Sequence, residues 1–346
     1  MLSIVIPVFN GMPYLPDLFE RLRSQTLQEF EVIFVDDGST DESGDYIRNK
    51  ISNGRYLGKY FYYSQSNQGA GAARNFGFQH TRGDYVWFLD CDDIISESFV
   101  ERMYLTAKQN DSDVVVCLCQ DYDNRSQEIK QNTYSVRKDL IPKKLPCDVS
   151  SSEIEHDFFH SFVWWPWDKI FKKSHIIKNT ISFDTLSSTN DLYFVCLAIM
   201  LSDKISILDE ILISHRINIP HSVSNVRYRS PLDCLTALDH IRKKMEKDKI
   251  WEKRKVDFIN YFLAFVHWHL ITLPSKGRIS LFYNTHIYYK SMKKDINDQI
   301  KFYYPGLNYV SQFLINPTIK DYLKVYNGSA LILHELNKIE KNYNKS

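Results

Sequence analysis

The 346-residue sequence predicts an α/β fold, a mostly parallel sheet with flanking helices, followed by a mainly helical C-terminal region. Short β-branched and aromatic runs recur in the first quarter of the chain, each followed by turn residues and a stretch of helical character. Nine of the 12 glycines lie within the first 83 residues, which concentrates tight backbone turns there. After Pro231 the apolar residues instead keep a helical spacing to the end of the chain.

The first four strands are expected at 2–8, 31–35, 59–64 and 85–89. Helical stretches between them give a βαβα alternation, which makes the strands parallel and places the helices on the faces of the sheet. Ser39 and Glu42 have the spacing of a capping box, so we expect a helix to begin at Ser39. Cys117 and Cys119 lie in an apolar run that is typical of a buried strand.

Later elements divide the chain into two parts. A helix is expected over 190–201, strands around 205–208 and 211–215, and helices from 232 onward. We therefore predict one domain over 1–228 and a helical, basic, aromatic-rich region over 229–346.

Composition excludes several classes of protein. With 44% hydrophobic and 25% charged residues, the chain is neither disordered nor fibrous. No run reaches the roughly 20 apolar residues that a membrane-spanning helix needs, and the first residues lack a basic leader, so we expect a cytoplasmic protein. The six cysteines include no CxxC pair and indicate neither a zinc site nor a disulfide framework.

Charge is distributed unevenly along the sequence. Residues 1–228 hold 23 basic and 31 acidic side chains, whereas 229–346 hold 20 basic and 11 acidic ones. Residues 242–255 alone carry eight basic and three acidic side chains. Basic helices with aromatic residues bind anionic lipid surfaces, so we expect peripheral contact with the inner face of a cell membrane. A solvated helix face is the alternative, and a homodimer contact is a third use of this region.

Acidic side chains follow the predicted strands, at the edge where parallel sheets bind ligands. The fourth strand exits into Asp90-Cys91-Asp92-Asp93, where three carboxylates repel one another. A hard divalent cation such as Mg²⁺ or Mn²⁺ relieves that repulsion and usually completes its shell with substrate phosphates. The plain alternative is a solvated turn with helix-capping aspartates.

The second and third strand exits suit a nucleotide. Aspartates at 36–37 can accept hydrogen bonds from a base or ribose. Small residues at 69–73 let the backbone approach a ligand, and Arg74 then lies within reach of a phosphate. A capped loop and a surface arginine are the alternatives. The sequence contains neither GxxxxGK[ST] nor GxGxxG, which argues against a P-loop enzyme or a dinucleotide dehydrogenase.

Together these motifs resemble the family 2 glycosyltransferases, which have the Rossmann-like GT-A fold. The matching segments are 3–10, 35–41, 67–77 and 83–93. The resemblance is close over 1–120, the nucleotide-sugar-binding part, and looser over 121–228, the acceptor and catalytic part. It implies an inverting transfer from a nucleotide-diphosphate sugar, usually a UDP-sugar, with Mn²⁺ or Mg²⁺ on the pyrophosphate.

The resemblance also assigns roles to individual residues. Residues that match the donor-binding positions of the family are Pro7, Val8, Asn10, Asp37, Asn67, Arg74, Asp90 and Cys91. The nucleoside pocket would include the first three, Asp37 would meet the base, and Asp90 would contact the ribose or the sugar. Asp92, the second carboxylate of the DXD motif, would bind the metal ion.

Members of the family have a Glu-Asp pair at the start of a helix, and the aspartate of that pair serves as the general base. The corresponding residues here are Asn190 and Asp191. Asp191 is therefore the candidate general base. The departure at Asn190 removes one carboxylate from its surroundings. Without the family context, Asp191 would be a helix N-terminal acid stabilised by the helix dipole.

Three further features belong to the acceptor side. Arg216 with Ser222 and Ser224 resembles an arginine followed by a serine-x-serine loop, one residue longer than usual. His221 is the candidate histidine ligand of the metal, and His215 competes for that role. Trp165 and Trp167 suit a platform on which sugars stack, although tryptophans are more often core residues. Lys169 and Phe171 match a structural Lys-x-aromatic pattern.

The sequence thus predicts a metal-dependent hexosyl- or N-acetylhexosaminyltransferase. It would transfer a sugar from a UDP-sugar to a glycan or lipid-linked glycan in bacterial cell-surface polysaccharide synthesis (capsule, exopolysaccharide or lipopolysaccharide), with no nucleic-acid partner. The alternative is a catalytically decayed GT-A protein that binds glycans or acts as a scaffold subunit. A sugar-nucleotide pyrophosphorylase would need a glycine-rich basic loop after the first strand, which the sequence lacks.

Overall fold

The computed structural model describes residues 1–52, 56, 58–130, 135–219, 227–292, 295, 302–304, 306–307 and 310–311. The chain forms two compact units. The sheet unit consists of Met1–Glu155 and Ser161–Pro220, and the helical unit consists of His156–His160 and His221–Ser346. The sequence-based boundary was placed after residue 228, and no local pattern indicates that 156–160 belongs with the C-terminal helices.

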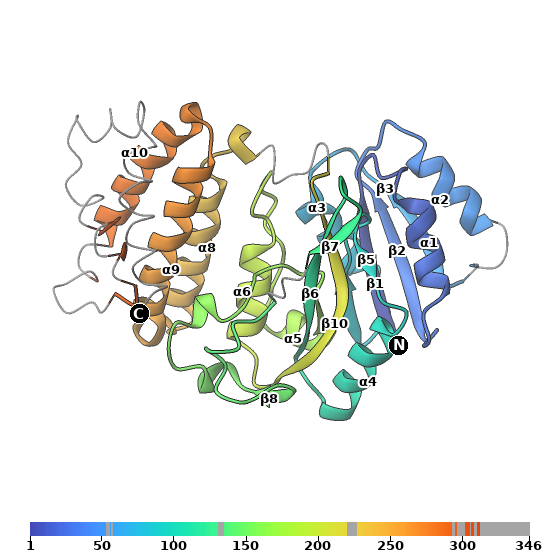
Figure 1. The fold of residues 1–346 in the computed structure, drawn as a ribbon, viewed down its shortest axis with the longest axis horizontal. Helices are drawn as coiled ribbons and strands as arrows, with labels where there is room; N and C mark the ends of the chain where they lie inside the picture. Colours follow the sequence, from blue (N-terminus) through green and yellow to red (C-terminus); the bar gives the residue numbers. More distant parts are fainter. Residues whose placement is uncertain are drawn as a thin grey trace. The chain divides into compact units, whose positions relative to one another are not determined.

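Among the described residues, the sheet unit is built on one ten-stranded sheet (Figure 1). Its main path runs β3-β2-β1-β4-β9-β6-β10-β5, with β7 beside β6 and β8 beside β10. The strands are β1 Leu2–Val8, β2 Phe30–Asp36, β3 Tyr60–Ser64, β4 Tyr85–Phe88, β5 Ile94–Ile95, β6 Val114–Asp123, β7 Glu128–Lys130, β8 Cys147–Val149, β9 Lys169–Lys172 and β10 Ile205–Ile217. Residues of β1 and β2 are buried throughout, as expected for parallel strands covered on both faces.

Strand direction gathers most of the strand exits at one edge of the sheet. Strand β1 is parallel to β2 and β4, and β2 is parallel to β3. Strand β9 is antiparallel to both β4 and β6, and β6 is parallel to β10. Because β9 is antiparallel to both of its neighbours, β4 and β6 run in the same direction. The same edge of the sheet therefore holds the carboxyl ends of β1, β2, β3, β4, β6 and β10. The amino end of β9 lies there too, and we call this edge the carboxyl edge.

The helices of the sheet unit follow the predicted alternation. They are α1 Leu15–Arg23, α2 Ser43–Ser52, α3 Ala70–Gln79, α4 Phe99–Asn110, α5 Lys173–Lys178 and α6 Leu192–Met200, with a 3₁₀ turn η1 at Ser151–Glu153. Helix α1 shows why such segments are helical. It has a proline in its first turn with Asp17 beside it, and Arg21 and Arg23 in its last turn, which suits the helix dipole.

Two local predictions differ from the structure. Helix α2 begins at Ser43 and not at Ser39, because Asp41 accepts a hydrogen bond of 3.0 Å from the Ser43 amide. The hydroxyl of Ser39 instead accepts a hydrogen bond from the backbone of Asn10. The two strands expected around 205–208 and 211–215 form the single strand β10, whose register against β6 shifts between Ile207 and Ile213.

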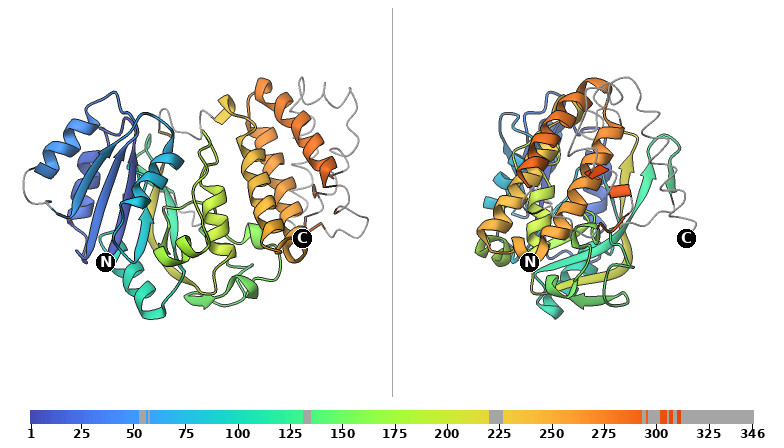
Figure 2. Two further views of the ribbon diagram at one scale, coloured as in Figure 1. Left: turned by 180° about the vertical axis from the view of Figure 1, so that it is seen from behind. Right: turned by 90° about the vertical axis from the view of Figure 1, so that its left-hand side faces the viewer.

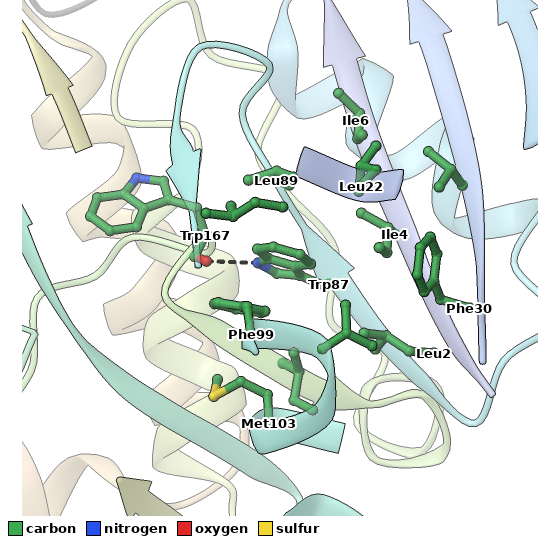
Figure 3. Close-up of a cluster of buried hydrophobic side chains, with 14 of the residues drawn as sticks. Leu2, Ile4, Ile6, Leu22, Phe30, Trp87, Leu89, Phe99, Met103 and Trp167 are labelled. Atoms are coloured by element: carbon green, nitrogen blue, oxygen red, sulfur yellow. Dashed lines mark hydrogen bonds between the residues drawn. The ribbon is translucent and has the colours of Figure 1, made fainter. Parts of the chain in front are cut away.

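Aromatic packing joins the first half of the sheet to the second (Figure 3). The Trp87 and Phe99 rings stack with their centroids 3.7 Å apart. The Trp87 Nε1 donates a hydrogen bond of 2.7 Å to the backbone carbonyl of Trp167, drawn as a dashed line in Figure 3. Strand β4 and the segment that precedes β9 are therefore fixed to each other beneath the carboxyl edge.

The helical unit contains η2 Phe158–His160, η3 Arg227–Arg229, α8 Asp233–Lys247, α9 Trp251–Thr272 and α10 Ser275–Ser291. Figure 2 shows the three long helices, in orange tones, packed side by side. The Phe159 ring packs on the Phe258 and Tyr261 rings of α9. The Asp157 amide donates to Asp257 at 3.0 Å, which explains why this short segment belongs to the helical unit. No helix in the described part of the chain is both long and apolar enough to cross a membrane.

Candidate functional site

The loops after β1 and β2 are fastened together at the carboxyl edge. Pro7 and Val8 are buried at the end of β1, and Asn10 follows in the left-handed region with φ +53, which asparagine tolerates. The Asn10 Oδ1 accepts hydrogen bonds from the amides of Thr40 and Asp41, at 2.8 and 3.3 Å. The exposed Asn10 thus holds the β2 loop in place beside the end of β1.

Asp37 ties the end of β2 to the segment that leads into α3. Its carboxylate is 3% exposed and accepts three hydrogen bonds of 2.7–2.8 Å, from the Gln65 side chain and from the amides of Gln68 and Gly69. Such a carboxylate organises the loop whatever else it binds. The predicted contact with a base would have to use the remaining lone pairs of its oxygens.

The β2 and β3 loops also touch directly. Gly38 has φ +76, and a Cβ atom at this position would lie 2.9 Å from the backbone nitrogen of Asn67. Only glycine suits both the backbone conformation and the close approach. The exposed Asn67 is therefore held beside the β2 exit, as its proposed place in a donor pocket requires.

Arg74 on α3 connects two distant parts of the chain. It is 5% exposed, and its guanidinium donates to Asp90 at 2.5 Å and to the Asn190 side chain at 3.0 Å. Its Nε is buried and has no hydrogen-bond partner in the part of the chain that the structure describes. The guanidinium also lies 5.3 Å from the centre of the Phe183 ring. The Arg74 guanidinium thereby links Asp90, just beyond the end of β4, to Asn190, the residue that precedes Asp191.

Asp191 lies at the N-cap position of α6, but its side chain makes no capping hydrogen bond. Burial raises the pKa of this carboxyl group to about 6, against the charge of Arg74, which lowers it, while Asp90 raises it further. Asp191 is therefore mostly ionised at neutral pH and able to accept a proton. The absence of a capping bond weakens the purely structural interpretation of this residue.

The Asp90–Asp93 turn concentrates negative charge. Burial and the neighbouring carboxylates Asp93 and Asp90 raise the pKa of Asp92 to about 7. The Asp93 Oδ2 is buried and has no hydrogen-bond partner among the described residues. Within the described residues, no three His, Cys, Asp or Glu side chains could hold a metal ion by themselves. Asp92 therefore fits a divalent ion only as one ligand among others, which is how such ions bind phosphate substrates.

Two consecutive residues of β10 hold this acidic turn. His215 donates from Nδ1 to Asp93 at 2.9 Å, and the facing carboxylates raise the pKa of His215 to about 9 despite its burial. The Arg216 Nε donates to the backbone carbonyl of Asp92 at 2.9 Å. The structure therefore gives His215 the role of an Asp93 partner, and Arg216 the role of a support for the turn.

Arg216 is held between two tyrosines that sequence reasoning missed. Its guanidinium lies 5.4 Å from the Tyr14 ring centre and 5.0 Å from that of Tyr122. Burial and the nearby Asp92 raise the pKa of Tyr14. Tyr122 lies near the end of β6, so its position at a strand exit could have identified it from the sequence as a residue of the site. Tyr14 precedes α1 and carries no such signal.

The tryptophans before β9 differ in their exposure. Trp167 is 2% exposed and stacks on His215 with ring centres 5.0 Å apart, whereas Trp165 stays partly exposed. The fully buried Lys169 donates to Asp168 at 2.6 Å and to the Trp165 carbonyl at 3.0 Å. Lys169 thus fixes the tryptophan loop, and Trp165 is more exposed than Trp167. His221, Ser222 and Ser224 lie outside the described residues.

A mixed α/β sheet with an acidic turn and an arginine-linked carboxylate at its carboxyl edge defines a protein of the GT-A class. Residues 3–184 match the family described as "Glycosyl transferase family 2". The chain therefore belongs to glycosyltransferase family 2.

Curated relatives agree with this assignment, and a solved structure shares the fold. The glycosyltransferase EpsJ of Bacillus subtilis is 26% identical over 263 residues, which cover 76% of this chain and 70% of EpsJ. The poly(ribitol-phosphate) β-glucosyltransferase of Bacillus spizizenii is 27% identical over 269 residues, 76% of this chain but only 39% of that enzyme. The structure of Staphylococcus aureus TarS 1–349 with UDP-GlcNAc superposes with a TM-score of 0.53, at 21% identity, over 82% of this chain and 86% of TarS 1–349. This likeness confirms the predicted GT-A fold.

Proposed function

We propose that this glycosyltransferase transfers a hexose or an N-acetylhexosamine from a UDP-sugar to a hydroxyl of a bacterial surface glycan, with inversion. The observation that carries the proposal is the position of Arg74, which joins the Asp90 turn to the residue beside Asp191. The solved complexes of TarS with UDP-GlcNAc and UDP support a UDP-sugar donor. The relative that glucosylates poly(ribitol-phosphate) supports an acceptor in a cell-surface polymer.

In this proposal Asp191 removes the proton from the acceptor hydroxyl while that oxygen attacks the anomeric carbon. The bond from the anomeric carbon to the diphosphate oxygen breaks, and UDP leaves with the bonding electron pair. A pKa of about 6 suits a base that works near neutral pH, because the ionised form predominates and still binds a proton well. Arg74 offers positive charge close to the donor side of the site.

Asp92 is the proposed ligand of Mn²⁺ or Mg²⁺. When bound, such an ion neutralises charge on the departing diphosphate. The raised pKa of Asp92 supports the assignment, because burial and the neighbouring carboxylates disfavour its charged form and a bound cation would favour it. The Asp93 Oδ2 has no hydrogen-bond partner among the described residues, although the Oδ1 of the same carboxylate is paired with His215. The donor diphosphate would supply the other oxygen ligands.

The acceptor side of the proposal rests on Trp165. Its partly exposed ring lies at the carboxyl edge, stacked on Trp167 with centroids 4.9 Å apart. An indole fixed in this way offers a flat apolar surface to a sugar ring at little cost in side-chain entropy. Trp167 is too buried to offer such a surface and supports Trp165 from beneath.

Contact with an anionic membrane is the remaining part of the proposal. Five of the eight basic residues in 242–255 form ion pairs with acidic residues of the helical unit. This stretch is therefore largely neutralised. Within the described residues neither Arg227 nor Arg229 forms an ion pair, and Arg227 lies 4.2 Å above the ring of Trp268, which is 45% exposed. With the exposed Tyr228, these residues form the patch that we propose for lipid contact.

A thermal-shift panel with UDP-, GDP-, CMP- and dTDP-sugars, each with and without Mn²⁺, tests the donor class. A ligand that binds the folded state raises the apparent melting temperature by mass action. We expect a shift with a UDP-sugar and Mn²⁺, and slow hydrolysis of that donor. A protein that binds UDP-sugars but never hydrolyses or transfers them would instead be the glycan-binding or scaffold protein of the alternative interpretation.

A further inference from the structure

The side chain of Asn75 on α3 pairs with both backbone groups of one residue, Phe183, in the segment that precedes Asp191. Its Nδ2 donates to the carbonyl of Phe183 at 2.9 Å, and its Oδ1 accepts from the Phe183 amide at 2.8 Å. This uses both ends of the Asn75 amide, much as a neighbouring strand would use its backbone. No other amino acid side chain of that length offers both a donor and an acceptor in this arrangement.

Two neighbours of Asn75 on the same helix face contact the same segment. Gly71 and Arg74 precede Asn75 by four and one positions, and a Cβ atom at Gly71 would lie 2.0 Å from the carbonyl oxygen of Asp184. The α3 backbone therefore packs directly against the segment. The Arg74 guanidinium binds the Asn190 side chain at the far end of it.

The segment 183–190 is a closed loop that leads into Asp191. The Asp184 amide donates to the Asn190 carbonyl at 3.2 Å, which joins the two ends of the loop. The Phe183 ring stacks on Phe194 of α6 with centroids 4.0 Å apart. Fixing Phe183 and Asn190 therefore fixes the start of α6, where Asp191 lies.

Helix α3 contacts the donor side at its N-terminus. Gly69, the N-cap residue of α3, donates its amide to Asp37 at 2.8 Å. Helix α3 therefore contacts Asp37, a proposed donor-binding residue, through its N-cap. Its side chains and backbone also contact the 183–190 loop. The distance between donor and base depends on how firmly α3 and that loop are joined.

We infer that Asn75 is a positioning residue for Asp191, and that its paired hydrogen bonds hold the base at a fixed place relative to the bound donor. The inference rests on the proposed function. Asn75 itself touches neither the donor nor the acceptor. Removing it would leave the donor loop intact and loosen the loop that leads to the base.

The test compares Asn75→Asp and Asn75→Ala with the wild type, in the full chain. Asn75→Asp keeps the size and the acceptor for the Phe183 amide but places a carboxylate oxygen against the Phe183 carbonyl. We expect kcat for UDP-sugar turnover to fall about 10- to 100-fold, because small misplacements of a reacting group are costly. The Kd for UDP with Mn²⁺, measured by calorimetry, should stay within about twofold.

Asn179→Ala is the matched control. Asn179 also binds backbone, since its Nδ2 donates to the His175 carbonyl at 3.0 Å, and it is similarly half-buried in the same unit. It is the C-cap residue of α5 and belongs to neither the donor loops nor the 183–190 loop. We expect Asn179→Ala to leave kcat unchanged. Amide hydrogen exchange at Phe183 should accelerate in both Asn75 variants and remain slow in the control, which shows that the loop and not the whole fold has loosened.

The pH profile separates positioning from a general loss of stability. Arg74 and Asp90 are the charged groups that face Asp191. In the neutral variant Asn75→Ala, loosening the loop admits water to Asp191, so the acid limb of kcat should move below its wild-type position, toward the ordinary range of an aspartate. An active wild type whose Asn75→Asp variant keeps full kcat, or loses UDP affinity by the same factor as kcat, would overturn the inference alone. A wild type that turns over no UDP-sugar would overturn the proposed function and the inference with it.

Discussion

Arg74 donates a hydrogen bond of 3.0 Å to Asn190, a residue 116 positions away and next to Asp191. Because Asn190 is neutral, Asp90 is the carboxylate that balances the Arg74 charge at hydrogen-bonding distance. The remaining field of Arg74 lowers the pKa of Asp191 against the effect of burial. The residue at position 190 therefore influences the pKa of Asp191, the proposed base.

The first prediction follows from that relationship. Asn190→Glu would introduce a carboxylate beside Arg74, cancel much of its field and raise the pKa of Asp191. The acid limb of kcat, expected near pH 6 in the wild type, should move to higher pH. A rate profile from pH 5 to pH 9 measures it, with Asn190→Gln as the neutral control. A limb that stays in place, or moves to lower pH, would contradict this account of the site.

The ionised Asp191 side chain should also destabilise the folded protein at neutral pH. Its pKa in the folded protein is about 6, above the ordinary value of 3.8, so the folded state binds the proton more tightly than the unfolded state. Stability therefore falls as pH rises from about 4 to about 6 and stays lower above that range. Since the group is partly exposed, we expect a loss of only about 1–2 kcal/mol.

Asp191→Asn tests this cost, because it removes the ionisable group and keeps its shape. Thermal melting should show the variant to be more stable than the wild type at pH 7, and the difference should disappear near pH 4. A variant that is less stable at pH 7 would show that the carboxylate contributes favourable contacts to the fold.

Asp92 should be needed for metal-dependent donor binding but not for folding. Asp92→Asn removes a charge whose ionisation the neighbouring carboxylates oppose, so the melting temperature should not fall. Calorimetry should show that Mn²⁺ no longer strengthens UDP binding. Asp45→Asn is the control, because Asp45 is an exposed carboxylate of the same unit that pairs with Arg48. Unchanged Mn²⁺-dependent affinity in Asp92→Asn would remove Asp92 from the metal site.

The membrane patch can be tested with vesicles. The double variant Arg229→Ala with Trp268→Ala should reduce sedimentation with anionic vesicles at low salt, since Arg229 and Trp268 are exposed residues of the patch. Lys243→Ala should have little effect, because Lys243 already pairs with Asp239 at 2.6 Å. The proposal for the patch is wrong if the wild type does not sediment with anionic vesicles. It is also wrong if Lys243→Ala reduces sedimentation as much as the double variant does.

The fold was predictable from sequence where local patterns determine it. Buried runs such as Leu2–Val8 and the turn residues that follow them identify the strands and their exits. The GT-A fold was inferred from the resemblance of the motifs at these exits to those of family 2 glycosyltransferases. Contacts between distant residues leave no such signal, and the roles of Asn75 and of segment 156–160 therefore appear only in the structure.

Side-chain partners were the least predictable part of the site. Asp37 occupies the expected strand exit, but nothing in the sequence shows that three donors already bind its carboxylate. The capping motif at Ser39 failed for a similar reason. Asp41 lies closer to the true start of α2, and the Ser39 hydroxyl pairs with Asn10 across the loop.

The stereochemistry of sugar release tests the central claim most directly. Proton NMR can follow the anomeric configuration of the sugar that the wild type first releases from an α-linked UDP-sugar in the presence of Mn²⁺. We predict that the β-anomer appears first. With Asp191→Asn, the rate should fall by about 10²- to 10⁴-fold while the Kd for UDP is unchanged, as expected when a general base is lost without loss of binding. Initial release of the α-anomer, or undiminished turnover by Asp191→Asn, would contradict an inverting transferase that uses Asp191 as its base.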